Sequence, residues 1–342
     1  MKPEWKDFLS DAGAEFAADG SVESFGNPNR ELQVSPAGEV ICDLSHLGLI
    51  SAHGDDARSF LQGQFSNDIH QVDPTHSQLS AYHTAKGRML ALMRIFQRDQ
   101  GLYLELPRDL LEDTLKRLRM FVLRSKVTLD DASDAFVRIG LAGPRAEERL
   151  HAAVGPFPSD PGKVCQVKGI TVLRLSGVKP RFEICGELDD IKRIWDELNV
   201  DCAPVGAPVW KLLNILAGVP TLYAVNREAF VAQMANLDRL GGISFTKGCY
   251  TGQEIVARMH YLGQLKQRMF AAVVKADAKP GDELFADDQA TGKVIDAAPH
   301  QEGGHALLGV MRVAAREADD VRLGSADGPR LNFIELPYPL QD

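Results

Sequence analysis

The hydrophobic and polar positions of the chain follow two periods, and the period changes several times along the sequence. Apolar residues that alternate with polar ones predict strands, and apolar residues three or four apart predict amphipathic helices. The stretch 78–107 contains three strand-like runs divided by the turn signals "AKG" and "RDQG", which predicts a meander. Further strands are expected at 47–54, 126–131, 136–143, 169–176 and 181–186, and helices at 55–64, 108–122, 144–155, 188–198 and 208–218.

The residues at the ends of these segments support several of the helices. Asp55 stands where an N-cap is expected for the first helix. The helix at 144–155 opens with Pro144 and closes with Gly155, as the preferences of these residues favour. The polar stretch 18–32 is rich in turn-forming residues and predicts a loop, so folded structure is expected to begin near Val40.

After Gly263 the pattern changes to short strand-like runs separated by glycine-rich turns, which predicts a small antiparallel barrel. The expected fold class is therefore α+β, with a mixed body followed by a β-rich domain. A chain of 342 residues is too long for one ordinary core. With the loop 155–163 as a boundary, the expected domains are 1–155, of which 1–39 is partly loop, 156–262 and 263–342.

The charge of the chain changes this picture at one place only. A formal net charge of −9 argues against a protein that coats nucleic acid by bulk electrostatics. The most basic segment, Lys116 to Lys126, has five cationic residues and no acidic one. At helical spacing such a segment is more often a solvated helix face than an RNA site, although a local basic patch is open to either interpretation.

The cysteines and the N-terminus indicate a cytoplasmic protein. Five cysteines are present, an odd number without a CxxC pair, which is typical of reduced thiols. No metal site is expected, because the histidines form no HxxxH or HExxH pattern either. The N-terminal residues lack the apolar core of a secretory signal, and the longest apolar run, 212–219, is far too short to span a membrane.

The stretch "FTKGCYTGQE", Phe245 to Glu254, carries the most distinctive chemistry. Thr251 followed by Glu254 three residues later matches a capping box, which predicts a helix from Gly252 to a stop at Gly263.

Cys249 lies two residues before that cap. The positive end of the helix dipole and the nearby Lys247 would favour its thiolate. The alternative is that Cys249 is a small apolar filler beside a helix start, the commoner case for a lone cysteine. His260 lies about three turns along the expected helix and is a poor catalytic partner.

Two other places offer polar side chains to a ligand. The cluster "LQGQFSND" contains Gln64 and Asn67, which could hydrogen-bond a heterocycle or form turns. Glu183 stands between two apolar residues of an expected strand, so its side chain faces a cleft or water.

Several stretches, in order, resemble the YgfZ family of folate-binding proteins. They are "CDLSHLGLISAHGDDARSFLQGQFSNDI", "LAGPRA", "RFEI", "LNILAGVP" and "NLDRLGGISFTKGCYTGQEIVAR". This family is a branch of the fold of the glycine-cleavage T-protein, an aminomethyltransferase. The resemblance extends from about Cys42 to the C-terminus, and the segment around Cys249 is the part specific to the YgfZ branch.

The resemblance implies a body around a central channel that holds tetrahydrofolate or a related folate, closed by a C-terminal barrel. It also implies a role in iron–sulfur cluster maintenance and in tRNA modification by cluster-dependent enzymes, which would be its partners. A protein with this role need not bind RNA through an extended basic surface. Cys249 would be the reactive or cluster-contacting thiolate, with Lys247 tuning it and Glu254 fixing the helix start.

The same resemblance suggests the folate contacts. Two tryptophans of the family match Leu47 and Trp210, and Leu47 leaves only dispersion contact on its side. Gln64, Asn67, Glu183 and Trp210 are the expected folate contacts, together with Arg88 for the anionic glutamyl tail.

One departure separates the chain from the T-protein. The catalytic aspartate segment of T-proteins matches "KGRMLALM", which has Leu90 and Ala91 instead of carboxylates. Without that charge, aminomethyl transfer loses an electrostatic partner, so a classical enzyme is not expected. The alternatives are a folate-dependent aminomethyl or one-carbon transferase and a non-catalytic scaffold.

Overall fold

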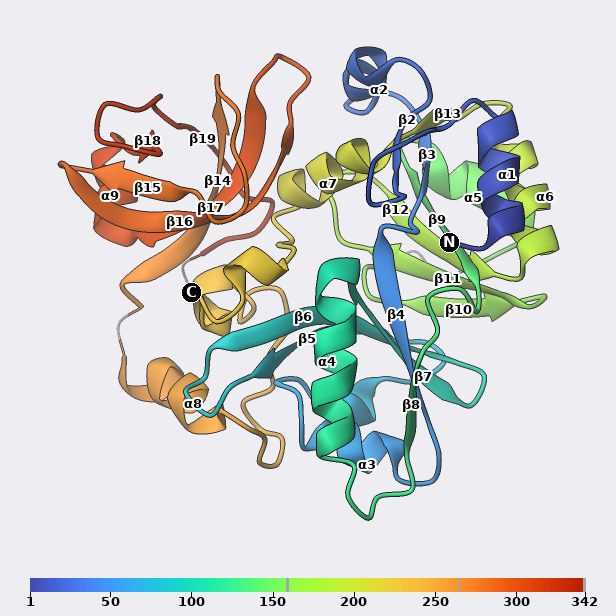
Figure 1. Ribbon diagram of the computed structural model, residues 1–342, viewed down its shortest axis with the longest axis horizontal. Coiled ribbons are helices and arrows are strands. Elements are labelled where there is room, and N and C mark those ends of the chain that lie inside the picture. Colours follow the sequence, from blue (N-terminus) through green and yellow to red (C-terminus); the bar gives the residue numbers. More distant parts are fainter. Residues whose placement is uncertain (158–159, 264, 341–342) are drawn as a thin grey trace. The chain divides into compact units, whose positions relative to one another are not determined.

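The computed structural model of the protein describes residues 1–157, 160–263 and 265–340. The chain forms two compact units, each assembled from separate stretches, and Figure 1 follows this path by colour. Unit 1 consists of Met1–Asp55, Val72–Ser77 and Ile95–Leu213, and unit 2 of Asp56–Gln71, Gln78–Arg94 and Asn214–Asp342.

A six-stranded sheet in the order β10-β11-β12-β9-β3-β13 forms the centre of unit 1. Its pairs are antiparallel except for β13 with β3, which is parallel. The strands are β3 (Val40–Asp43), β9 (Val137–Ala142), β10 (Val164–Val167), β11 (Ile170–Leu175), β12 (Arg181–Gly186) and β13 (Ala203–Val205). The sequence predicted β9, β11 and β12, but not the short strands β3, β10 and β13.

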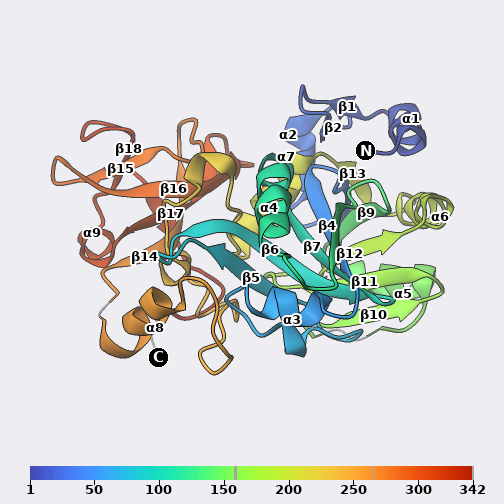
Figure 2. The same cartoon turned by 60° about the horizontal axis from the view of Figure 1, so that its bottom comes forward.

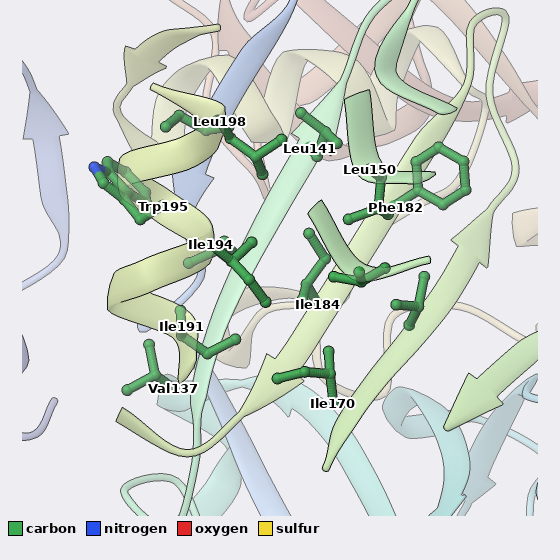
Figure 3. Close-up of a cluster of buried hydrophobic side chains, with 14 of the residues drawn as sticks. Val137, Leu141, Leu150, Ile170, Phe182, Ile184, Ile191, Ile194, Trp195 and Leu198 are labelled. Atoms are coloured by element: carbon green, nitrogen blue, oxygen red, sulfur yellow. The ribbon is translucent and has the colours of Figure 1, made fainter. Parts of the chain in front are cut away.

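Three helices share the core that lies on one face of this sheet (Figure 3). They are α1 (Pro3–Asp11), α5 (Ala146–Val154) and α6 (Leu188–Leu198). In α6 the residues Ile191, Ile194, Trp195 and Leu198 are buried, which is the spacing of one helix face. From β12 the alternate residues Phe182 and Ile184 join the same core. The helical period of 3.6 residues and the strand period of two thus place apolar side chains of α6 and β12 in the same core.

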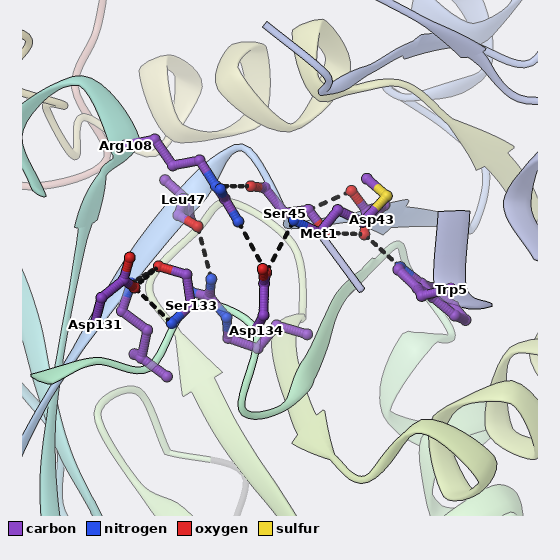
Figure 4. Close-up of polar contacts among 11 residues, drawn as sticks. Met1, Trp5, Asp43, Ser45, Leu47, Arg108, Asp131, Ser133 and Asp134 are labelled. Atoms are coloured by element: carbon purple, nitrogen blue, oxygen red, sulfur yellow. Dashed lines mark hydrogen bonds and ion pairs between the residues drawn. The ribbon is translucent and has the colours of Figure 1, made fainter. Parts of the chain in front are cut away.

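The N-terminal residues belong to this core, so the prediction that folded structure begins near Val40 was wrong. The indole of Trp5 is buried and donates a hydrogen bond of 2.7 Å to Asp43 (Figure 4). The ammonium of Met1 lies 2.9 Å from the carboxylate of Asp134. The region also contains β1 (Glu15–Phe16), β2 (Val22–Ser24) and α2 (Pro28–Val34). Turn-forming residues concealed α2, because Asn27 is in fact its side-chain N-cap.

A second sheet has the order β5-β6-β7-β4-β8. Its strands are β4 (Leu47–His53), β5 (Gln78–His83), β6 (Met89–Arg98), β7 (Gly101–Pro107) and β8 (Thr128–Asp131). The predicted meander β5-β6-β7 is confirmed, and the boundary between the units falls within β6. The amphipathic helix α4 (Arg108–Met120) follows β7 directly and packs against β4 and β8.

Short helices and one longer helix form the part of unit 2 that precedes the C-terminal strands. They are α3 (Ala57–Gln62), η1 (Ile69–Gln71), η2 (Ala224–Asn226), η3 (Ala232–Ala235) and α8 (Gln253–Leu262), while α7 (Ala207–Leu216) crosses the boundary between the units. The N-cap of α3 is Asp56, without a side-chain bond, so the prediction of Asp55 was wrong by one residue. In α5 the helix begins at Ala146, after Pro144, and Gly155 closes it with φ of 100° as predicted.

The C-terminal part of unit 2 is a curled antiparallel sheet, a half-barrel (Figures 1 and 2). Its order is β18-β15-β16-β17-β14-β19, and a cluster of buried apolar side chains forms its core. The elements are β14 (Gln267–Val274), β15 (Glu283–Ala286), β16 (Gln289–Pro299), β17 (His305–Arg312), α9 (Val313–Ala318), β18 (Arg322–Leu323) and β19 (Asn332–Ile334). The predicted antiparallel strands are confirmed, although β18 and β19 are edges, so hydrogen bonds do not close the sheet into a full barrel.

The expected boundary loop 155–163 includes residues 158–159, which lie outside the described residues, and the three-domain division of the chain stays a prediction. Among the helices of the described residues, none has the length and apolar character needed to cross a membrane.

Candidate functional site

The segment around Cys249 lies within unit 2, between η3 and α8. The structure describes all five cysteines, and Cys249 alone is exposed. Burial raises the pKa of Cys185 to about 12 and that of Cys202 to about 11, and it also raises the pKa of Cys42 and Cys165. Cys249 is therefore the accessible thiol of the chain, not a buried filler.

Lys247, two residues earlier, is only 9% exposed. Its ammonium donates hydrogen bonds to the carbonyl oxygens of Gln62, Phe65 and Asn67, at 2.7, 2.7 and 2.9 Å. An ammonium has three donors, and these bonds use all of them. Gln62 is the last residue of α3, where carbonyls lack helical partners, and Phe65 and Asn67 lie in the loop that follows. Lys247 therefore holds the segment against the loop after α3, and the prediction that it tunes Cys249 stays a prediction.

Burial lowers the pKa of Lys247 to about 8, while the carboxylate of Asp68 acts in the opposite direction. The ammonium also lies 5.1 Å from the ring centroid of Tyr250. Hydrogen bonding and the aromatic face both favour the charged form against the cost of burial.

The polar cluster after α3 makes further contacts with the chain that leads into the segment. The Ser66 hydroxyl donates to the carbonyl of Gly242 at 2.7 Å, and the amide of Asn67 donates to those of Gly241 and Leu79. The cluster was expected either to bind a ligand or to form turns. Asn67 has a structural role, because its side chain joins two loops through these hydrogen bonds. Gln64 is half-buried.

On its other side the segment packs against the turn between β5 and β6. Gly252 has φ of 84°, and a Cβ there would lie 2.5 Å from the carbonyl oxygen of Thr84. Gly252 is also the N-cap of α8, which ends before Gly263 as predicted. The capping box of Thr251 and Glu254 was wrong, because a glycine at the N-cap has no side chain to accept the bond.

Tyr250 of the segment lies against His83 of β5, with ring centroids 5.9 Å apart. Burial lowers the pKa of His83 to about 4 and raises that of Tyr250 to about 12, so both are neutral at physiological pH. Among the described residues, neither ring nitrogen of His83 nor the Tyr250 hydroxyl has a hydrogen-bond partner. The sequence analysis missed this pair. Tyr250 adjoins Cys249, but no local signal marks His83 on a distant strand.

His260, dismissed above as a partner for Cys249, stacks on Phe245 with centroids 3.7 Å apart. Beside this stack is a cavity of about 420 Å³ within unit 2, whose lining includes Gln233, Asp238 and Arg268. No group of three or more His, Cys, Asp or Glu side chains in the described part of the chain is placed to hold a metal ion.

The residues expected to contact folate divide equally between the units. Leu47, Glu183 and Trp210 belong to unit 1, and Gln64, Asn67 and Arg88 to unit 2. Because each unit is described by itself, their assembly into one pocket stays a prediction.

In unit 1 two of these residues are core side chains. Trp210 is 2% exposed, and its indole lies so close to Gly140 that a Cβ there would be 2.6 Å from the ring. Glu183 is buried in β12, so the alternative that it faces water is wrong. It lies near Arg138, whose pKa is raised by Glu105 and Glu183 despite burial. Leu47 is half-buried, and its carbonyl accepts a 2.7 Å bond from Arg138.

In unit 2 the side chain of Arg88 is half-buried and donates to the carbonyl of Ala229 at 2.7 Å. Leu90 and Ala91, expected to replace the T-protein carboxylates, are buried on β6.

The chain is similar to known proteins in sequence and in fold. The model of the GCVT N-terminal domain family matches residues 15–208. A protein named tRNA-modifying protein YgfZ from Klebsiella pneumoniae (strain 342) is 32% identical over 309 residues, which cover 89% of this chain and 94% of that protein. Its namesake from Yersinia pseudotuberculosis serotype IB (strain PB1/+) is 32% identical over 333 residues, covering 96% and 98%. The chain belongs to the YgfZ family.

The fold of this YgfZ-family chain is also found in a solved structure. The crystal structure of the glycine cleavage system aminomethyltransferase T from Bartonella henselae matches with a TM-score of 0.73 at 15% identity, covering 97% of this chain and 95% of that one. The family resemblance and the aminomethyltransferase-like α+β fold inferred from the sequence are therefore confirmed.

Proposed function

We propose that this YgfZ-family protein is a cytoplasmic folate-binding factor that supports iron–sulfur-dependent modification of tRNA, and that Cys249 is its reacting thiol. The proposal rests on one observation: the single exposed thiol lies between Lys247 and Gly252, and both of these residues make close contacts with other parts of unit 2. Its relatives are named for tRNA modification, which supports the cellular role.

The anchoring gives the thiol a defined position. Lys247 binds the segment to the loop after α3, and Gly252 sits against the turn that follows β5. A fixed, accessible sulfur meets an incoming group without first being ordered, which lowers the entropic cost of the encounter. The group that Cys249 would meet on another molecule is a cluster, a partner thiol or a folate.

Within unit 2 the half-buried Gln64 and Arg88 would contact the folate, while the side-chain amide of Asn67 is already hydrogen-bonded to the carbonyls of Leu79 and Gly241. A guanidinium has five donors, and the bond from Arg88 to Ala229 leaves others for a carboxylate of the glutamyl tail. Trp210 and Glu183 are too deeply buried within unit 1 to touch a ligand directly, so we assign them a structural role within that unit.

The role of the thiol is tested by complementation in cells that lack the native protein. Cys249→Ser should fold normally but fail to restore cluster-dependent thiolation of tRNA, measured by mass spectrometry of tRNA nucleosides. The matched control is Cys165→Ser, at a half-buried thiol outside the segment, which should restore it fully. Full restoration by Cys249→Ser would refute the assignment.

Folate binding is tested separately by calorimetric titration of tetrahydrofolate into the purified protein. Binding in the micromolar range is expected, weakened by Arg88→Ala most strongly for polyglutamylated folate. Absence of heat at high micromolar ligand would instead favour a scaffold without a ligand. Turnover of an aminomethylated carrier to methylene-tetrahydrofolate would favour the transferase, against which the buried apolar pair Leu90 and Ala91 argues.

A further inference from the structure

The end of α4 and the loop that follows it, residues 116–126, expose apolar side chains to solvent; we call this segment the α4 tip. Met120, Phe121 and Leu123 are 59%, 44% and 88% exposed, and all belong to unit 1. Leu123 also has φ of 43°, a left-handed conformation that costs a leucine energy. Because the side chain of Leu123 is exposed, packing in the core does not offset this cost. Core packing therefore does not explain the conformation of the tip.

Cationic residues flank these apolar residues in the sequence. They are Lys116, Arg117, Arg119, Arg124 and Lys126, and the segment contains no acidic residue. Arg119 is bound to Asp130 at 2.8 Å, and exposed Lys126 lies 3.6 Å from Asp55, a pair that water screens strongly. Basic residues in the last turn complement the dipole of α4, which explains a solvated helix end. The dipole does not explain why three large apolar side chains are exposed beside them.

One aromatic ring is held in place at the centre of the tip. The guanidinium of Arg117 lies 5.9 Å from the ring centroid of Phe121. Such a pair keeps the ring oriented while the ring remains partly open to solvent.

We propose that the α4 tip binds unpaired RNA, with a base stacked on Phe121 and phosphates bound by Lys116, Arg124 and Lys126. Stacking on an aromatic side chain and cationic contact with the backbone are the two elements by which proteins hold single-stranded nucleic acid. Met120 and Leu123 extend the carbon surface against which a base and its ribose pack. The inference rests on the proposed function, which places an RNA substrate near this protein.

The charge of the whole chain agrees with a local site. A net charge of −9 repels a polyanion elsewhere, so binding confined to the tip should be moderate and should depend on salt through a few contacts. Each phosphate that is neutralised on a single strand contributes about −0.7 to the slope of log affinity against log salt, so three contacts predict a slope of about −2.

The test measures binding of a fluorescently labelled, unmodified tRNA transcript to the full-length protein by anisotropy at several salt concentrations. Phe121→Ala should weaken binding about tenfold and leave the salt slope unchanged, because it removes stacking and no charge. The triple variant Lys116→Glu, Arg124→Glu, Lys126→Glu should abolish binding at moderate salt. The matched controls are Val200→Ala, at another exposed apolar residue of unit 1, and Lys168→Glu, at another exposed lysine; both should bind like the native protein.

No binding by the native protein, or equal binding by the tip variants, overturns the proposal. Two further outcomes also overturn it, by giving the tip another occupant. If the native protein sedimented with phosphatidylglycerol vesicles and the tip variants did not, the partner of the tip would be a membrane. If the tip variants bound tRNA normally but failed to support tRNA modification in cells, the partner of the tip would be an acidic protein. The assay is independent of Cys249, so a failure of the proposed function through Cys249→Ser leaves the RNA result standing, and the reverse also holds.

Discussion

At the scale of single residues, Lys247 shows how a charged side chain can serve as a structural tie. Its three hydrogen bonds join the segment of Cys249 to carbonyls that lie far away in the sequence. A buried charge is tolerated where its donors are all used, because unpaired donors and acceptors cost more than the bonds gain.

Replacement of Lys247 by methionine should therefore destabilise the protein. The variant keeps most of the apolar volume but leaves the carbonyls of Gln62, Phe65 and Asn67 without their shared donor. We expect a loss of about 2–4 kcal/mol in the free energy of unfolding, measured with urea. Lys247→Arg, which keeps charge and donors, should lose less. Equal stability of Lys247→Met and the native protein would show that water satisfies these carbonyls.

His83 predicts a specific sensitivity to acid. Its ordinary pKa of 6.5 falls to about 4 in the folded protein, so the unfolded chain binds the proton more tightly. Stability is therefore complete above pH 6.5 and is lost as the pH falls through that window toward 4. Near pH 5 the loss from this one group is about 2 kcal/mol.

His83→Phe should remove that loss, and at neutral pH it should be neutral or stabilising because two unpaired nitrogens disappear. Urea unfolding of both proteins from neutral pH to about pH 5 measures the difference. Some acid sensitivity should persist in the variant, because the pKa of half-buried His46 is also lowered, to about 3. Parallel curves for the two proteins would contradict the assignment to His83.

At the scale of elements, the sequence predicted those whose pattern is local. The meander β5-β6-β7 and the helices α4 and α6 follow from periodicity, since their buried positions recur at fixed spacing. The N-terminal helices were missed because few of their residues are apolar, and distant partners such as Asp43 for Trp5 stabilise them.

The candidate site was predicted less completely than the elements. The sequence singled out Cys249 and the bounds of α8, but its capping box was wrong and it did not predict the structural roles of Lys247 and Gly252. Those roles depend on loops that meet only in the folded protein, and no spacing within the segment reports them.

The two glycines of the segment provide a test of how it packs. Gly252→Ala places a methyl group 2.5 Å from the carbonyl oxygen of Thr84 at a φ of 84°, so the turn or the start of α8 must shift. We expect a loss of about 2 kcal/mol or more in stability. Gly248→Ala is the matched control, because a Cβ there meets nothing within 4 Å, and it should be tolerated. Equal melting temperatures of the two variants would refute the close approach.

At the scale of the whole molecule, each unit is built from stretches that are separated in the sequence. Local patterns can find the elements but cannot group them, because the grouping depends on contacts between distant stretches. The distribution of the thiols is a property of this complete fold. Three cysteines are buried, burial raises the pKa of the half-buried Cys165, and Cys249 is exposed on the surface.

This distribution predicts the thiol count of the native protein. A thiol reagent attacks the thiolate, so groups whose pKa is raised by burial react slowly as well as being shielded. One equivalent of a maleimide should react rapidly with the native protein and all five cysteines with the unfolded chain, as intact mass spectrometry can count. Cys249→Ser should lose the rapid equivalent. Half-buried Cys165 is the stringent control. If it were modified at the rate of Cys249, exposure would not distinguish one thiol from the other. The observation on which the proposed function depends would then be lost.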